Sequence, residues 1–315
     1  MRKIYLAMAS AALMMLTAAC SNDNVEPADQ TAVQFAVNLD GIESRAPGDG
    51  TTVDQLIFAV YDSEGNELTQ LRQDDIDVTG RQALVTTSVA RGQDYTFVFW
   101  AQKRDNGHYN TANLKDVVVS YDGPANDESR DAFTATVVKS QVNAPISETV
   151  KLYRPFAQLD YVCDIDEWEN VFKSIYQLDG CELTVAGGAF THLNLLTGKA
   201  SQPTAVGDPF VMATANFVTT RTASGATVTY DDLFTGQDGN KFWISMNYLL
   251  ASTEQTTLGA TTLNIYPHSD SPKPIVVTSD NVPIRRNHRT VIYLSDLTKL
   301  ASANISIDPG FGGDL

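Results

Sequence analysis

Residues 33–39 read VQFAVNL, and this short stretch decides the fold class. Its odd-numbered residues are large and apolar, whereas the residues between them are polar or small. Successive side chains of an extended chain point to opposite faces, so a period of two places all the large apolar groups on one face. The stretch therefore predicts a β-strand with one buried side and one side that faces solvent.

The rest of the chain carries the same kind of signal. Short runs rich in Val, Ile, Phe, Tyr and Thr are separated by Gly, Asp and Asn, a pattern typical of all-β sandwiches. Helical spacing is rare, and the best helix candidate covers residues 166–178, with Asp166 as its cap. The sequence thus predicts an all-β fold. The further expected strands are 54–61, 83–89, 95–101, 114–121, 133–139, 156–163, 181–186, 190–196, 226–230, 242–250, 261–266, 274–279, 284–294 and 303–307.

The sequence from residue 31 onward is long enough for more than one domain. Single domains commonly hold about 100–150 residues, and one β-sandwich holds about 100. We therefore predict an N-terminal β-sandwich at 31–150 and a C-terminal β-sandwich with a terminal strand at 151–315. The boundary follows an Asn-Ala-Pro sequence at 143–145.

The first residues predict export and a lipid anchor. Arg2 and Lys3 precede an uncharged apolar run at 4–16, and the small residues at 17–19 lead directly to Cys20. A positive start, a short apolar core and a small-residue cleavage site are the three parts of a secretory signal. A cysteine at this point favours a lipoprotein signal peptide at 1–19 and lipidation of Cys20; the alternative is an ordinary secretory signal. The polar residues 20–30 are then a lipidated tether.

The chain is strongly acidic. Lys and Arg number 22 and Asp and Glu 38, a formal net charge of −16. Cleavage before Cys20 removes Arg2 and Lys3 and no acid, so the mature charge is 20 − 38 = −18. Such a surface repels nucleic acid and anionic head groups, which excludes nucleic acid as a partner. The outer membrane is therefore reached through lipid rather than through charge.

Two cysteines are left once Cys20 is lipidated. Cys163 and Cys181 both fall in the second half of the chain. Exported proteins meet oxidising conditions, so a disulfide between them is one prediction. Two buried, independent thiols are the alternative.

Chemical motifs are scarce. The four histidines are scattered without HExxH spacing, and the glycine pair at 187–188 has no serine of a nucleophile elbow. The acidic clusters near 74–77, 122–131 and 231–232 are interpreted as solvated turns. We therefore predict no catalytic residue, no cofactor and no metal site.

A basic run stands out against this acidic background. Residues 285–289 include Arg285, Arg286, His288 and Arg289. One interpretation is a binding patch for an acidic partner. The other, which we favour, is that they flank a strand with outward side chains that pair with nearby acids.

Several strings recur in order in one protein family: FVFWA at 97–101, the segment 121–133, LYRPFAQL at 152–159, SMNYLL at 245–250, VPIRRNHRT at 282–290 and the closing 305–311 segment. Together they resemble the fimbrillin-like lipoproteins of Bacteroidales, which are related to anchor and accessory subunits of type V pili. This resemblance implies two tandem transthyretin-like Greek-key β-sandwiches, no enzymatic activity and a surface-exposed position on the outer membrane. The partners that it implies are other pilus subunits, or host or bacterial surface ligands.

The resemblance also implies assembly by strand exchange. In such pili a protease releases an N-terminal strand, and a strand from a neighbouring subunit fills the groove, which is β-augmentation. Here the strand 33–39 precedes Arg45 and Ala46, which sit where stalk subunits are cut after arginine. The alternating tail 303–307 could act as a donor. We expect most molecules to stay uncut and lipid-anchored, as an accessory or anchor subunit.

A different class of function stays open. A surface glycan-binding lipoprotein of a polysaccharide-uptake system would also be lipidated, acidic and β-rich. It would need exposed aromatic rings on one face, so the positions of Trp168 and Tyr109 discriminate between the two functions.

Overall fold

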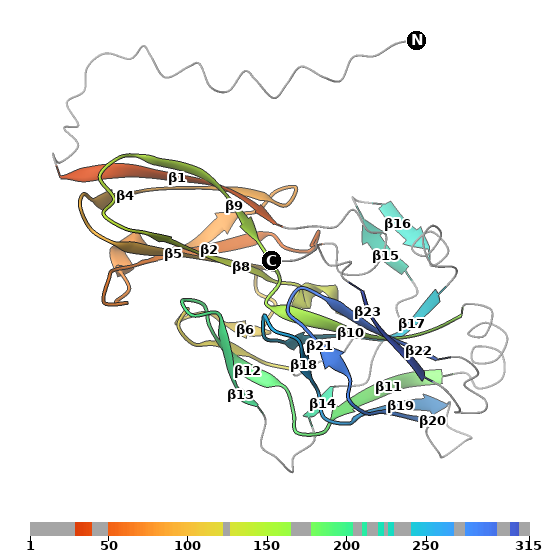
Figure 1. Cartoon of the computed structure of the whole chain (residues 1–315). Helices are drawn as coiled ribbons and strands as arrows, with labels where there is room; N and C mark the ends of the chain where they lie inside the picture. Colours follow the sequence, from red (N-terminus) through yellow and green to blue (C-terminus); the bar gives the residue numbers. More distant parts are fainter. Residues whose placement is uncertain are drawn as a thin grey trace, which may run out of the picture.

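The computed structural model describes the chain in segments that together form an almost entirely β architecture (Figure 1). The all-β prediction is confirmed. In the part of the chain that the structure describes, no helix is long and apolar enough to cross a membrane. The described residues are 29–39, 50–121, 127–164, 178–203, 210–212, 220–223, 226–229, 241–267, 275–294 and 303–308.

The first half of the chain forms two facing sheets. One has the order β4-β1-β9 and the other the order β3-β2-β5-β8. Two short 3₁₀ turns, η1 (Thr69–Leu71) and η2 (Glu128–Arg130), lie in connections of this half. The strands are β1 (Gln30–Leu39), β2 (Gln55–Tyr61), β3 (Gln73–Asp77), β4 (Gln82–Ala90), β5 (Tyr95–Gln102), β8 (Phe133–Lys139) and β9 (Ile146–Leu152).

The second half is built around a large sheet with the order β23-β22-β10-β17-β12-β7-β6, to which β13 adds by pairing with β12. A second sheet has the order β14-β11-β19-β20, and two short pairs, β15-β16 and β18-β21, complete the arrangement. The strands are β10 (Phe156–Asp164), β11 (Leu178–Val185), β12 (Phe190–Asn194), β13 (Lys199–Pro203), β14 (Phe210–Met212), β15 (Thr220–Ala223), β16 (Ala226–Thr229), β17 (Lys241–Leu250), β18 (Thr256–Thr257), β19 (Thr261–Pro267), β20 (Ile275–Ser279), β21 (Pro283–Ile284), β22 (Arg289–Leu294) and β23 (Ala303–Asp308).

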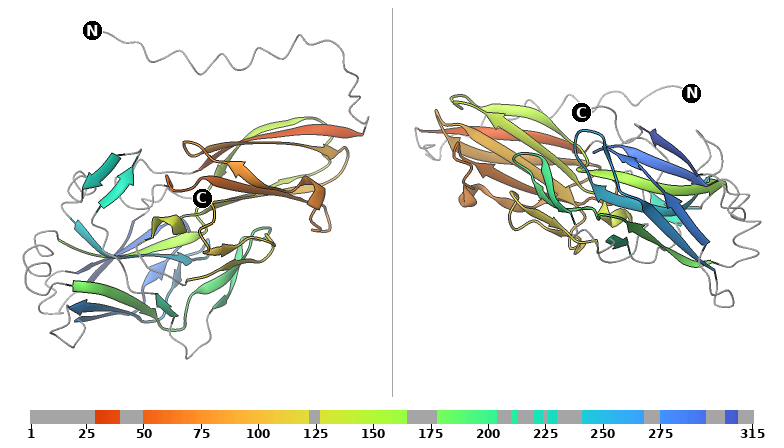
Figure 2. Two further views of the ribbon diagram at one scale, coloured as in Figure 1. Left: turned by 180° about the vertical axis from the view of Figure 1, so that it is seen from behind. Right: turned by 60° about the horizontal axis from the view of Figure 1, so that its bottom comes forward.

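The connection between β5 and β8 leaves the first half and joins the large sheet of the second. It carries β6 (Tyr109–Asn110) and β7 (Val117–Val119), and β7 pairs antiparallel with β12. Figure 2 shows these short strands lying under the first half, against the second (both views). The division into domains at 31–150 and 151–315 and the tandem transthyretin-like topology both stay predictions.

The β3-β2-β5-β8 sheet is covered on both faces. Phe58, Phe97 and Phe99 point into the core shared with β1, whereas Tyr61 and Trp100 on the same two strands point into the core of the second half. Both faces of such strands must be apolar, which explains the unbroken apolar runs at 56–61 and 97–101. The two halves therefore share a sheet as a common wall between two hydrophobic cores.

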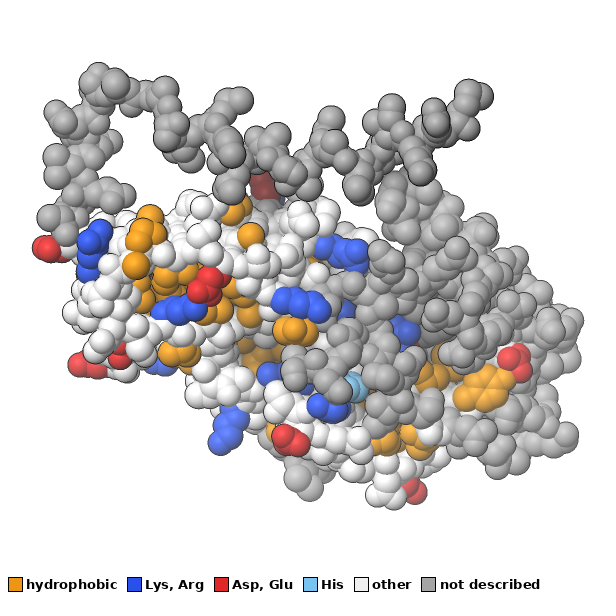
Figure 3. All heavy atoms as spheres, turned by 45° about the horizontal axis from the view of Figure 1, so that its top comes forward, with side chains coloured by type: hydrophobic (Ala, Val, Ile, Leu, Met, Phe, Trp, Pro, Cys, Tyr) orange, Lys and Arg blue, Asp and Glu red, His pale blue; other side chains and the backbone are white. Residues whose placement is uncertain are grey.

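The outer surface of the first half is mixed in character. Figure 3 shows hydrophobic side chains gathered among Lys, Arg, Asp and Glu on the face of the first half that is turned to the viewer. One of the large apolar residues at the surface is Leu84 of β4, which is 55% exposed. Isolated apolar residues of this kind are normal on protein surfaces.

Several sequence predictions fall outside the described residues. These are the lipidation of Cys20, the cleavage site at Arg45 and Ala46, and most of the helix predicted at 166–178. Another prediction needs correction: the single strand expected at 284–294 is two strands, β21 and β22, separated by residues 285–288. Asn287 there has a φ of +59°, which an extended strand does not allow.

Candidate functional site: the first strand and its surroundings

The first strand lies in the middle of a sheet although it comes first in the chain. β1 pairs antiparallel with β4, with Phe35 opposite Val85. On its other side β1 pairs parallel with β9, with Phe35 opposite Glu148. A central strand has its backbone N–H and C=O groups bonded on both sides, so its removal would open two strand edges at once.

The inward face of β1 is apolar and well packed. Val33, Phe35 and Val37 are each exposed by 1% or less, and Leu39 by 6%. The ring of Phe35 lies 5.1 Å from that of Phe97 and 5.3 Å from that of Phe99, both edge to face. Aromatic pairs in this geometry contribute about 0.5–1.5 kcal/mol beyond the area that they bury. The alternation predicted for 33–39 is therefore confirmed, and the strand begins three residues earlier.

Polar contacts of β1 gather at its ends. Arg91 N–H donates to the carbonyl of Asp29 at 2.8 Å, and Arg91 Nε–H donates to the carbonyl of Gln30 at 3.0 Å. The Ser88 hydroxyl donates to Gln30 Oε1 at 3.0 Å. At the other end, Leu39 N–H donates to the carbonyl of Arg81. The body of the strand is thus held by backbone pairing and apolar packing.

After β1 the described residues resume at Gly50, which is closely packed against its neighbours. Gly50 has a φ of +73°, and a Cβ built there would lie 2.9 Å from the ring of Phe133. Arg154 stacks over that same ring at 4.4 Å. Arg45 and Ala46 lie in the sequence between Leu39 and Gly50, outside the described residues.

A buried ion pair marks the meeting point of the two halves. Arg154 donates from Nε and Nη2 to the two carboxylate oxygens of Asp131, each at 2.7 Å, and both side chains are at most 1% exposed. Its backbone N–H donates to Asn287 Oδ1 at 3.3 Å. A bidentate pair of this kind sets the orientation of both side chains. Asp131 belongs to the acidic cluster at 122–131 that was interpreted as solvated turns, and that interpretation is wrong for this residue.

The basic run is largely buried as well. Arg286, His288 and Arg289 are each exposed by 7% or less. Arg286 Nη2–H donates to the carbonyl of Gly198 at 2.7 Å, and Arg289 Nε lies 3.3 Å from Asp160 Oδ2. The expectation of outward side chains is therefore wrong for these three residues. They connect elements of the second half instead of forming an exposed patch.

One cluster resembles a catalytic triad in composition but not in geometry. His108 Nε2 lies 3.0 Å from Asp127 Oδ2 and 3.3 Å from Ser129 Oγ. A triad needs the acid on one ring nitrogen and the hydroxyl on the other, whereas here both contact Nε2. Burial by itself would raise the pKa of Asp127, but hydrogen bonds from His108 and Ser129 outweigh it and lower the pKa to about 2. The cluster ties the β5–β6 connection to η2.

Other predicted site residues lie in structural positions. Cys163 and Cys181 are buried thiols in this structure, and Cys181 donates to the carbonyl of Ile244 at 3.3 Å. Their disulfide stays a prediction, which intact-mass measurement after alkylation without reduction would test. Among the described residues, no three His, Cys, Asp or Glu side chains gather in a way that could hold a metal ion. Trp168 lies outside the described residues.

Solved structures with a similar fold come from the same group of bacteria. A "putative cell adhesion protein" of Bacteroides uniformis is 12% identical with a TM-score of 0.48, covering 89% of this chain and 96% of that chain. The tip fimbrial protein Mfa3 of Porphyromonas gingivalis is 12% identical with a TM-score of 0.46, covering 89% and 98%. A fimbrial assembly protein of Parabacteroides distasonis is 11% identical with a TM-score of 0.42, covering 89% and 99%.

The match at the level of sequence families is more extensive. No curated protein matches the sequence. The model of one family, however, matches residues 24–315, which is nearly the whole chain beyond the predicted signal peptide. The chain therefore belongs to the family of unknown function DUF6562.

Proposed function

We propose that this protein is a non-enzymatic, lipid-anchored surface subunit of the fimbrillin-like kind, with β1 at the position where subunits exchange strands. The observation that carries the proposal is the placement of β1. It is the first strand of the chain, yet it sits between β4 and β9 and presents only apolar side chains and one threonine to the core. A strand from a neighbouring subunit with the same alternation could occupy that position by β-augmentation.

The energetics favour a molecule that keeps its own strand until a partner is present. Burial of a large apolar side chain contributes roughly 1.5–3 kcal/mol, so Val33, Phe35, Val37 and Leu39 together contribute roughly 6–12 kcal/mol. The whole free energy of unfolding of a domain is about 5–15 kcal/mol. A first half without β1 would therefore lose most of its stability. We infer that the uncut chain, anchored through Cys20, is the resting form and acts as an accessory or anchor subunit.

We propose β23 as the strand that is donated to a neighbouring subunit. β23 is the last described strand and lies at the edge of its sheet, where it pairs antiparallel with β22 alone. Ile305, in the middle of β23, is 38% exposed. An edge strand held on one side separates from its sheet at lower cost than a central strand, because only one ladder of hydrogen bonds is broken.

The test is the N-terminus of the mature protein. Mass spectrometry of protein shaved from whole cells and of protein extracted from outer membranes should find acylated Cys20 as the first residue. Ala46 as the first residue in surface polymers would contradict the uncut resting form and would make the protein a stalk subunit. In that case Arg45→Ala should abolish the new terminus, whereas the neighbouring control Ser44→Ala should leave it unchanged. An unacylated terminus near Cys20 would contradict the lipid anchor.

Glycan capture on an aromatic platform has less support as the whole function. The ring of Tyr109 lies 5.2 Å from that of Trp100 and 5.7 Å from that of Phe156. Its hydroxyl donates to the carbonyl of Arg130. The ring is therefore fixed within the packing between the halves, and only a part of it reaches the surface, at the edge of a cleft. It does not form an exposed aromatic platform.

A further inference from the structure

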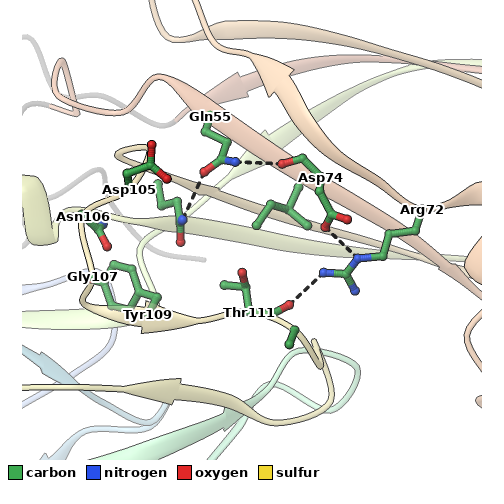
Figure 4. A pocket seen from close by; sticks show the side chains of 11 residues that line it. Gln55, Arg72, Asp74, Asp105, Asn106, Gly107, Tyr109 and Thr111 are labelled. Carbon is green, nitrogen blue, oxygen red and sulfur yellow. Dashed lines mark hydrogen bonds and ion pairs between the residues drawn. The ribbon is translucent and has the colours of Figure 1, made fainter.

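A polar cleft lies between the first half and the β5–β8 connection, which carries β6 and is called the excursion below. Its volume is about 690 Å³, within the range of about 300–1,000 Å³ usual for small-molecule sites. Gln55, Arg72, Asp74 and Gln102 line it from the β3-β2-β5 side, and Asp105, Tyr109 and Thr111 line it from the excursion. Figure 4 shows Gln55 and Asp74 on one side of the hollow, with Tyr109 and Thr111 opposite.

The amide groups of this cleft are held in fixed orientations. Trp100 Nε1–H donates to Gln102 Oε1 at 2.8 Å, and Gln102 Nε2–H donates to Gln55 Oε1 at 3.1 Å. Gln55 Nε2–H then donates to the carbonyl of Asp74 at 2.8 Å. An indole can only donate, so each amide must present its oxygen toward Trp100 and its nitrogen away from it. Each of these amide nitrogens keeps a second N–H that this chain of bonds does not use.

The guanidinium of Arg72 is already engaged. Its Nε–H donates to Asp74 Oδ1 at 2.7 Å, its Nη1–H to Glu67 at 3.1 Å and its Nη2–H to the carbonyl of Thr111 at 2.8 Å. The last of these bonds joins the two walls of the cleft. With each nitrogen committed and a formal net charge of −16 on the chain, the cleft is poorly suited to an anionic ligand.

The remaining groups define the chemistry of a ligand. Asp105 is exposed at the cleft and makes no ion pair or hydrogen bond within the part of the chain that the structure describes, so its carboxylate is available as an acceptor. Apolar lining comes from the partly exposed ring of Tyr109, behind which Ile57 is buried. Fixed amide donors, a carboxylate acceptor and an apolar floor suit a compound with many hydroxyl groups and one apolar face.

We propose that this cleft binds a neutral saccharide. A sugar hydroxyl can donate to Asp105 and accept from the second N–H of Gln55 or Gln102, while the C–H face of the sugar ring packs against the exposed part of the Tyr109 ring. The inference goes beyond the proposed strand exchange, because it gives the surface subunit a ligand class of its own. It does not depend on β1.

The test uses the mature full-length chain and a panel of neutral gluco-, manno- and galacto-oligosaccharides. Binding is measured by saturation-transfer NMR and by calorimetry. We expect at least one of these to bind with a Kd below roughly 10 mM, and Ala112→Trp, which fills the cleft, to weaken binding by at least about tenfold. Gln55→Leu, which removes one donor and keeps the side-chain size, should also weaken it.

The matched control is Ala144→Trp, which places the same bulky group in the exposed β8–β9 connection, away from the cleft. This variant should bind within about twofold of the unaltered chain. The proposal is overturned if none of the neutral oligosaccharides binds, if Ala112→Trp binds as well as the control, or if anionic oligosaccharides bind more tightly than neutral ones. Equal thermal midpoints for the two tryptophan variants would show that any loss of binding is local. A negative result would leave the strand-exchange proposal standing.

Discussion

β1 and β10 occupy equivalent positions in the two halves but are held in different ways. β1 lies between antiparallel β4 and parallel β9, and β10 lies between antiparallel β17 and parallel β22. β1 alternates buried and exposed residues and puts mainly apolar groups inside. β10 is buried along almost its whole length and includes Gln158 and Asp160, each 0% exposed. Gln158 Nε2–H donates to Asp160, which forms an ion pair with Arg289 of β22.

The difference shows which strand can be replaced. An apolar groove accepts any strand with the right alternation and approximate size, because hydrophobic packing is non-directional. A buried carboxylate accepts only a partner that supplies the matching charge and hydrogen bonds. We therefore propose β1 as the exchangeable strand, whereas β10 is held by buried polar contacts that a foreign strand would have to reproduce.

The largest loss of stability is expected when Asp160 of β10 loses its charge. Asp160→Asn keeps the shape of the side chain but removes the carboxylate charge that lies beside the buried guanidinium of Arg289. Breaking one side of a buried ion pair reduces the free energy of unfolding by about 3–5 kcal/mol. Chemical denaturation at neutral pH measures the loss.

The matched control for that change is the exposed pair of β8 and β9. Lys139 Nζ lies 2.6 Å from Glu148, with side chains exposed by 30% and 44%. Glu148→Gln should change the free energy of unfolding by about 0–1 kcal/mol. Similar losses for the two variants would mean that β10 is not fixed by its buried charge, and the contrast with β1 would fail.

A smaller loss of stability is expected in acid, where the contact between His108 and Asp127 is weakened. The pKa of Asp127 is lowered to about 2 in the folded chain, below its ordinary value near 3.8. A lowered pKa stabilises the fold above the unfolded value, and that stabilisation is lost as the pH falls from about 4 to about 2. The loss should amount to about 1–2 kcal/mol. It appears as the difference in unfolding free energy between the unaltered chain and Asp127→Asn, which should be present at pH 6 and vanish toward pH 2.

This loss of stability in acid should not affect β1, because the side chains that β1 packs into the core are apolar. Hydrogen exchange at low pH should therefore open the β5–β6 connection and η2 before the amides of β1. If the amides of β1 lost protection first, the claim that β1 is held by apolar packing and not by charge would be wrong.

β1 itself should tolerate a change of shape. Phe35→Leu keeps the side chain apolar but removes part of its volume and both aromatic contacts, so we expect a loss of about 1–3 kcal/mol in the free energy of unfolding. Thermal unfolding of the variant measures this. A loss as large as that of Asp160→Asn would show that β1 is fitted as specifically as β10 is.

The smallest effect concerns the outward face of β1. Gln34 is exposed and lies opposite Thr86 and Ser147. Gln34→Thr should change the free energy of unfolding by less than about 0.5 kcal/mol, as surface substitutions usually do. A larger loss, measured by denaturation, would point to a partner on that face.

The sequence predicted strands wherever burial leaves an apolar signature. Residues 33–39 and 95–101 were recognisable for this reason. β3 (Gln73–Asp77) was missed because an edge strand with three aspartates carries little apolar signal. Arg104 Nη2 lies 2.8 Å from both Asp75 and Asp77, and these ion pairs became visible only in the structure. Charged edge strands of this kind also resist unwanted pairing.

The surroundings of β1 could not be predicted in the same way. Its alternation was readable, but its pairing with β9 joins residues more than a hundred positions apart, and local sequence does not encode such a partner. The pair of Asp131 and Arg154 is likewise spatial. Its two members stood in strings that indicated a turn and a strand, and their contact depends on how the halves meet.

The exchangeability of β1 is tested most directly by removing the strand and supplying it again. A chain that begins at Ala46 is refolded with and without a peptide of residues 29–40, and hydrogen exchange is followed in β4 and β9. The account predicts that the amides of both strands gain protection only with the peptide, and that a peptide carrying Phe35→Asp gives none. Equal protection of β4 and β9 without the peptide, or no binding of the peptide, would contradict it.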